Sequence, residues 1–138
     1  MPPIDSPLFA SWLLKVLPVA YLAVTFLQSG LDKVFDWKGN LSWQTGFFSK
    51  VPVIRSQVKP MLASLTVLEI LTGVVCAVGV VMLLATGSPR IACVGGMLSG
   101  LTFVALLFGQ RIAKDYAGAA GIGPYFLVSL AAIFFNRG

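Results

Sequence analysis

Four long apolar runs separated by short polar segments make up most of the chain. The second run, Met61 to Ala85, would be about 37 Å long as an α-helix, which is enough to cross a bilayer with some tilt. The pattern predicts an all-α membrane protein. We expect a bundle of four transmembrane helices, with spans at approximately residues 10–33, 61–85, 91–109 and 117–135.

Prolines interrupt the first and fourth runs. A fourth helix that started at Pro124 would be about 18 Å long, too short to span. The helix therefore begins near Ala117 and kinks at Pro124, or the glycine-rich part before Pro124 is irregular backbone held inside the bundle. Pro18 predicts a kink in the first span, or the point at which an interfacial first turn becomes the span.

The longest loop, residues 36–59, is too apolar for a free linker. Its apolar residues Leu41, Phe47, Phe48 and Val51 would share one face of a short helix. We expect an amphipathic segment lying in the membrane interface, with a turn at Gly39-Asn40 before it.

Composition supports a membrane protein with almost no soluble part. Of the 138 residues, 57% are hydrophobic and only 11% charged, whereas soluble domains are about a quarter charged. The length fits one membrane domain. The basic residues lie between the apolar runs, so the net charge of +5 predicts contact with anionic lipid and no nucleic-acid partner.

The sequence also limits the chemistry that the chain can perform alone. It contains no histidine and no C-x-x-C pair, so we expect no metal site, no catalytic centre and no redox centre of its own. The two cysteines, Cys76 and Cys93, fall at different depths in the predicted bundle. We expect two unpaired thiols, because a disulfide needs alpha carbons within about 7 Å.

Basic residues are distributed unequally between the two ends of the predicted bundle. Four spans put both termini on one side, together with Lys15, Arg90 and Arg137, while seven basic residues fall on the other side. The positive-inside rule then places the long loop in the cytoplasm and both termini outside.

Glu69 is the only formal charge in the second apolar run, roughly 12 Å from its start. A carboxylate in hydrocarbon must have a partner, reach water or be protonated. Other polar residues lie toward the same end of the predicted bundle: Gln28, Asp32, Lys33, Gln110, Arg111, Lys114 and Asp115.

Two interpretations of this cluster stay open. In the first, Glu69 is one half of an internal ion pair with Lys33 or Arg111 that fixes helix packing. Alternatively, the cluster is a small-ligand site at the mouth of the bundle. Lys33, Arg111 and Glu69 fit the needs of a quinone head, although the spacing alone does not require a quinone. A cleft open beside Glu69 would favour a ligand, and a closed pair would favour a scaffold.

The third run contains the motif Gly96-x-x-x-Gly100, which predicts a face for close packing against another helix. That helix belongs either to the same chain or to a second copy.

Several segments together resemble one protein family. They are Gln28-Ser29-Gly30-Leu31-Asp32-Lys33, Asp36-Trp37-Lys38-Gly39, Glu69-x-x-x-Gly73 and the block from Gln110 to Gly118. In this order they resemble the DoxX-like family of small four-span bacterial membrane proteins, related to the DoxD-type subunit of thiosulfate:quinone oxidoreductase. Within the motifs, Gly30, Lys33, Glu69 and Gly73 match the family pattern.

The resemblance implies a quinone-linked or redox-associated subunit of a complex in the bacterial cytoplasmic (inner) membrane. In such a membrane the charge distribution described above predicts periplasmic termini. Any electron transfer would need a bound quinone or a partner subunit. The expected partners are the lipid bilayer and other subunits of a membrane complex, or a second copy of the chain. The alternatives are a non-catalytic accessory or assembly subunit and, less well supported, a small-molecule transporter. A transporter predicts broken helices at matching positions of two halves, and Pro18 and Pro124 do not match in this way.

Overall fold

The computed structural model of the chain describes residues 2–48, 58–112 and 116–137, and these contain helices and no strand. The helices are α1 (Pro7–Phe35), α2 (Trp37–Phe47), α4 (Val58–Ala85), α5 (Arg90–Ile112) and α6 (Tyr116–Asn136). All four apolar runs are therefore helical, and each helix extends one to three residues beyond at least one end of its predicted span.

Three of the helices, α1, α4 and α5, are long and apolar enough to cross a membrane. In α6 the apolar stretch is shorter, Ala120–Asn136, so length and composition are sufficient for a membrane span in three helices and not in the fourth. The helix α6 nevertheless starts at Tyr116 and continues through Pro124. Of the two alternatives for the glycine-rich segment, the helical one is confirmed.

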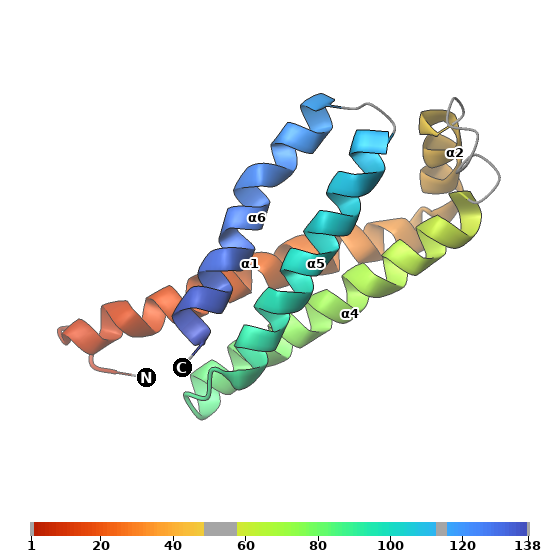
Figure 1. The fold of residues 1–138 in the computed structure, drawn as a ribbon. Helices are drawn as coiled ribbons and strands as arrows, with labels where there is room; N and C mark the ends of the chain where they lie inside the picture. Colours follow the sequence, from red (N-terminus) through yellow and green to blue (C-terminus); the bar gives the residue numbers. More distant parts are fainter. Residues whose placement is uncertain (1, 49–57, 113–115, 138) are drawn as a thin grey trace.

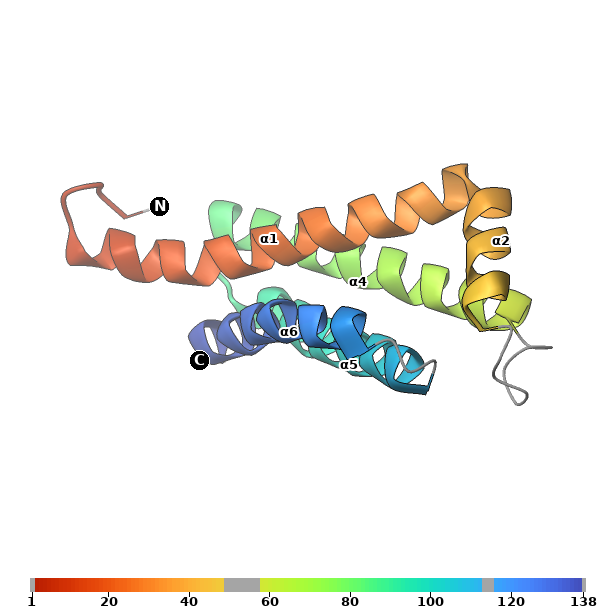
Figure 2. The same ribbon diagram turned by 90° about the horizontal axis from the view of Figure 1, so that it is seen from above.

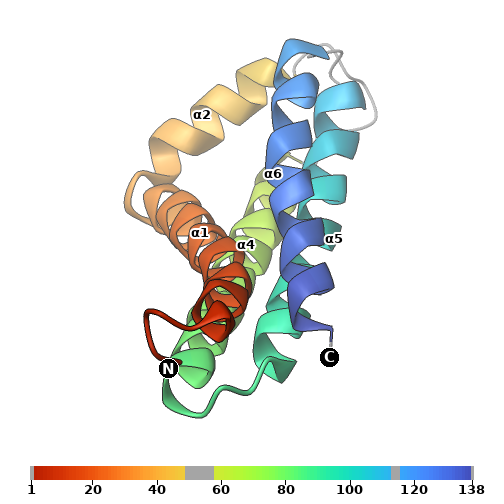
Figure 3. The same ribbon diagram turned by 90° about the vertical axis from the view of Figure 1, so that its left-hand side faces the viewer.

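The long helices form two layers (Figures 1 and 2). One layer contains α1 and α4, and the other contains α5 and α6, with α4 also packed against α5. The short helix α2 lies across the end of the bundle where α1 ends and α4 begins. Figure 3 shows both ends of the chain at the opposite end of the bundle, as an even number of antiparallel long helices requires.

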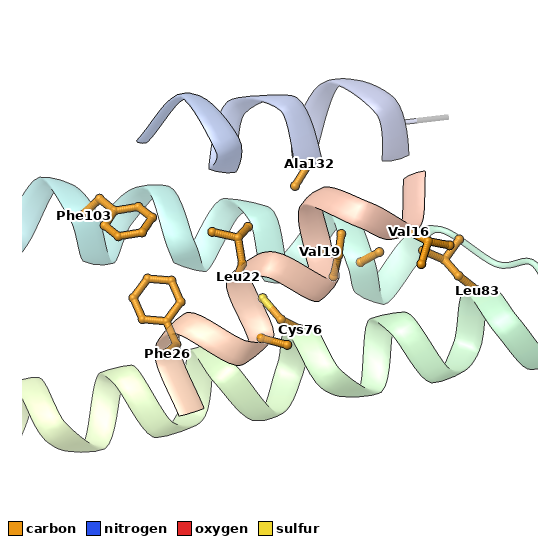
Figure 4. Close-up of a cluster of buried hydrophobic side chains, with 10 residues drawn as sticks. Val16, Val19, Leu22, Phe26, Cys76, Leu83, Phe103 and Ala132 are labelled. Carbon is orange, nitrogen blue, oxygen red and sulfur yellow. The ribbon is translucent and has the colours of Figure 1, made fainter. Parts of the chain in front are cut away.

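The centre of the bundle is filled mainly from α1 (Figure 4). Val19, Leu22 and Phe26 are almost completely buried, and the Phe26 ring lies 4.9 Å from that of Phe103 on α5. This is within the range of favourable aromatic pairs. Since most of the remaining helix surface is apolar and exposed, the chain has the surface expected of a protein whose solvent is lipid.

Both cysteines are free, as predicted. Cys76 is buried and Cys93 is partly buried. The Cys76 thiol lies 3.5 Å from the Ser99 hydroxyl of α5, at a point where Gly95 allows the two helices to approach. Cys76 therefore contributes to helix packing.

The prediction of a turn at Gly39-Asn40 is wrong, because both residues lie inside α2. The helix begins directly after Asp36, whose carboxylate lies over Gly39, where a β-carbon would be 2.5 Å from Oδ2. Asn40 donates both its backbone N–H and its side-chain amide to the Asp36 carbonyl. An acidic residue at a helix start is favourable, and Gly39 here makes room for it. Leu41 and Phe48 belong to this segment, whereas Val51 lies outside the described residues.

A tight turn between the second and third apolar runs joins α4 to α5. The backbone N–H groups of Thr86 and Gly87 both donate to the Met82 carbonyl. Gly87 has a φ of 75°, the left-handed conformation in which glycine commonly ends a helix. This turn returns the chain antiparallel as α5.

Candidate functional site

The closest approach of α1 and α4 is made at two glycines, Gly30 and Gly73. A β-carbon on Gly30 would lie 2.5 Å from Ile70 Cγ1, and one on Gly73 would lie 2.9 Å from the backbone nitrogen of Leu27. Only glycine allows backbones this close. The crossing brings the polar residues on this face of α1 directly against α4.

At this crossing Glu69 is held by Ser29 and Lys33. The Lys33 ammonium donates to Glu69 Oε2 at 3.0 Å and to Ser29 Oγ at 2.9 Å. The Ser29 hydroxyl in turn donates to the same Oε2 at 2.9 Å. The Glu69 side chain is only 2% exposed, against 13% for Lys33. This triad is a closed ion pair, because the charge-assisted hydrogen bonds hold the carboxylate away from solvent.

The sequence left two candidate partners for Glu69, Lys33 and Arg111. In the structure the partner is Lys33. Arg111 is exposed at the end of α5. The sequence analysis did not assign Ser29 to the cluster around Glu69. Its position, four residues before Lys33 on the same face of α1, was the signal that it shares the carboxylate.

The other predicted residues do not join the triad. Gln28 and Asp32 are exposed on a different face of α1, beside α6. Lys114 and Asp115 lie outside the described residues. The predicted cluster is therefore not one site: Lys33 and Glu69 pair at the α1–α4 crossing, Gln28 and Asp32 lie beside α6, and Gln110 and Arg111 belong to α5.

The motif Gly96-x-x-x-Gly100 faces α6 of the same chain. A β-carbon on Gly96 would lie 3.0 Å from Ile133 Cγ1, and one on Gly100 would lie 3.5 Å from the Ser129 hydroxyl. Of the two alternatives left open for the partner helix, the structure has the internal one.

A second feature is an apolar cavity of about 290 Å³ between α2, α4 and α5, which we call the Gln110 pocket. Its lining residues are Trp43, Phe48, Met61, Ser64, Leu65, Leu68, Ala105, Leu106, Gly109 and Gln110. The amide oxygen of Gln110 is buried and finds no hydrogen-bond partner among the described residues. A buried acceptor without a partner is costly, so this atom is the chemically distinctive point of the pocket.

A third feature is a polar cavity of about 390 Å³ between α1 and α6, which we call the Tyr21 cleft. Its lining residues are Tyr21, Thr25, Gln28, Ser29, Asp32 and Tyr125. Sequence reasoning missed this cleft, although four of the α1 residues are spaced by four, three and four positions and so form one stripe along the helix.

Three apolar helices of membrane-spanning length, polar side chains turned inward and an apolar outer surface are consistent with a multi-pass membrane protein. No family model, curated protein or solved structure matches the chain. Function must therefore be argued from the triad and the two cavities.

Proposed function

We propose that the chain is a four-span membrane protein of the DoxX-like kind that binds the head of a quinol-type molecule in the Gln110 pocket. It would act as a redox-associated subunit of a complex in the bacterial cytoplasmic membrane. The observation that carries the proposal is Gln110, a lining residue of an apolar cavity whose amide oxygen is buried and has no hydrogen-bond partner among the described residues.

The fourth span in this proposal is α6. Its 21 residues give a length of about 31 Å, close to the thickness of a bilayer core. With α6 across the membrane, both termini lie on one side, and the basic residues of the long loop place that side outside the cell.

The chemistry of the pocket favours a ligand with a hydroxyl group. The Gln110 oxygen accepts hydrogen bonds and cannot donate them, so the atom without a partner would be satisfied by the hydroxyl of a reduced quinol. A quinone carbonyl could pair only with the NH2 group of the same amide. The volume of about 290 Å³ lies at the small end of ligand pockets, which start at about 300 Å³. It would hold one substituted ring and leave an isoprenoid tail among lipid.

Glu69 has a supporting role in this account. Its carboxylate faces α1 and is closed off by Ser29 and Lys33, whereas Leu65 and Leu68 of the same helix line the pocket. The ligand contacts therefore fall on Gln110 and the apolar wall instead of on Lys33, Arg111 and Glu69. Electron transfer itself would be performed by a partner subunit.

Binding of a short-tailed hydroquinone and its quinone to the purified protein in nanodiscs tests the proposal. We expect the hydroquinone to bind about tenfold more tightly, the difference that one added hydrogen bond of about 1.4 kcal/mol produces. Gln110→Leu should abolish this preference. Gln28→Leu, which removes a glutamine on the other side of the bundle, is the matched control and should retain it. Equal binding of the two forms by the unmodified protein contradicts the proposal.

The closed triad favours a second candidate function, a membrane subunit that binds no ligand and serves the assembly of a larger complex. Native mass spectrometry of the protein extracted gently from its membrane separates the two. A quinol that copurifies and is lost in Gln110→Leu supports binding. A partner protein with no small molecule supports the assembly role.

A further inference from the structure

The Gln110 pocket opens on the outer surface of the bundle. Two of its lining residues, Ser64 on α4 and Ala105 on α5, are exposed. A residue that lines a cavity and is also exposed lies where that cavity meets the surface. Both side chains are small, so neither covers the opening. The pocket can therefore be reached from the side, between α4 and α5.

This opening lies at the depth of the Gln110 amide. The helices α4 and α5 are antiparallel and touch at Thr72 and Thr102, whose hydroxyls are 3.2 Å apart. Ser64 lies eight residues before Thr72 on α4. Gln110 lies eight residues after Thr102 on α5. Each is thus about 12 Å along its helix from the same contact, and a molecule that enters beside Ser64 arrives at the amide whose oxygen has no partner among the described residues.

The surface around the opening is apolar. Val67, one turn beyond Ser64 on α4, and Leu101, one turn before Ala105 on α5, are both 67% exposed. The exposed apolar positions then continue along the two helices through Leu71, Val74, Met97 and Val94. Since α4 and α5 are both long and apolar enough to span a membrane, these stripes would be in contact with acyl chains.

The opposite end of the pocket is formed by α2. Phe48 is only 3% exposed, and its ring lies beside Gly109, where a β-carbon would be 3.8 Å from the ring. Trp43, which also lines the pocket, is 62% exposed. Exposed tryptophans in membrane proteins favour the level of the lipid headgroups. The pocket therefore extends from the headgroup level at α2 to the acyl chains at Val67 and Leu101.

We propose that the ligand of the Gln110 pocket enters from the bilayer between Ser64 and Ala105, and that its tail lies along the exposed stripes of α4 and α5. This inference rests on the proposed function and deepens it, because it restricts the ligand to an amphiphile, a hydroxylated ring that carries a hydrocarbon tail. The cavity of about 290 Å³ holds the ring, and the tail occupies the surface that acyl chains would otherwise cover.

Ala105→Phe tests the opening by obstructing it. This variant should weaken the binding of a tailed hydroquinone in nanodiscs by about tenfold or more, because the added ring overpacks the entrance. The matched control is Ala63→Phe, which adds the same ring at an exposed position of α4 outside the pocket lining, and it should bind normally. Ala105→Gly should also retain binding. Equal affinities of Ala105→Phe and Ala63→Phe overturn the proposal.

Photocrosslinking locates the tail directly. The probe is a hydroquinone whose alkyl tail has a diazirine close to the ring, photolysed with the full chain in nanodiscs. We expect mass spectrometry to find crosslinks at Val67 and Leu101 that are lost in Gln110→Leu and suppressed by an excess of hydroquinone without a tail. Crosslinks that depend on Gln110 but fall only on α1, α2 or α6 overturn the lateral entrance and leave the proposed function standing. Crosslinks that persist unchanged in Gln110→Leu overturn both.

Discussion

The polar residues on the two sides of α1 differ in how deeply they are buried. On the side of α4, Gly30 and Lys33 lie against the helix that carries the buried Glu69 carboxylate, and Ser29, which also borders the cavity on the other side, donates to this carboxylate. On the side of α6, Gln28 and Asp32 are left exposed in a cleft. The difference arises from the approach of the helices, which is close at Gly30 and Gly73. Polar residues one position apart in the same helix can thus be buried in an ion pair on one side and border an open cavity on the other.

The largest expected effect comes from breaking the pair on the closed side. Glu69→Leu leaves the Lys33 ammonium without its partner at the helix crossing and should reduce the free energy of unfolding by about 3 kcal/mol. The double variant Glu69→Leu/Lys33→Met removes both charges and should recover most of this loss. Reversible unfolding in mixed micelles measures each variant. A double variant that loses the sum of both single effects would contradict a structural ion pair.

A second comparison uses glycines on closed and open surfaces. Gly73→Ala puts a methyl group 2.9 Å from the backbone nitrogen of Leu27 and should cost about 1–3 kcal/mol through overpacking. Gly121→Ala, on α6 with nothing within 4 Å of the new carbon, should instead stabilise by about 0.5–1 kcal/mol, because alanine favours helix. The same unfolding measurement checks both, and equal effects would mean that the α1–α4 crossing is looser than described.

The α5–α6 contact gives a smaller effect. Gly96→Ala brings a methyl group to 3.0 Å from Ile133 Cγ1 and 3.1 Å from the Ile133 backbone nitrogen. These contacts are longer than the 2.9 Å at Gly73, so the cost should be about 1 kcal/mol. Native mass spectrometry should find the oligomeric state unchanged. A change in oligomeric state with no loss of stability would mean that Gly96 packs against a second copy.

The smallest effect is expected at a buried hydroxyl pair. Thr72 and Thr102 lie 3.2 Å apart between α4 and α5. The Thr102 hydroxyl donates to the Leu98 carbonyl of its own helix, so the bond between the two threonines uses the Thr72 hydroxyl as donor. Hydrogen bonds between membrane helices average about 0.6 kcal/mol. A double-mutant cycle with Thr72→Val and Thr102→Val should give a coupling of that size. A coupling several times larger would mean that this hydroxyl pair is a major polar contact between α4 and α5.

The sequence predicted the helices well because their signal is local. Each apolar run is helical, the Thr86–Arg90 turn is present, and both thiols are free. The exception is α2, where Gly39-Asn40 was read as a turn. The glycine is needed there because the Asp36 carboxylate lies over it, a contact that residue propensities do not contain.

The site was harder to predict because it depends on helix rotation. Sequence alone placed Glu69, Lys33, Asp32 and Arg111 at one end of the bundle but could not say which side chains face each other. The Gln110 pocket joins residues of α2, α4 and α5 that are far apart in the chain. The Tyr21 stripe was visible in the sequence, but its significance depends on α6 lying opposite.

The most direct test of this division of α1 compares two neutralised carboxylates. Unfolding free energies are measured side by side for Glu69→Gln and Asp32→Asn in the same micelles. We predict that Glu69→Gln loses about 2 kcal/mol, since it replaces charge-assisted hydrogen bonds, and that Asp32→Asn changes by less than about 0.5 kcal/mol, as surface changes do. Equal losses in the two variants, or a stable Glu69→Gln beside a destabilised Asp32→Asn, would contradict the account.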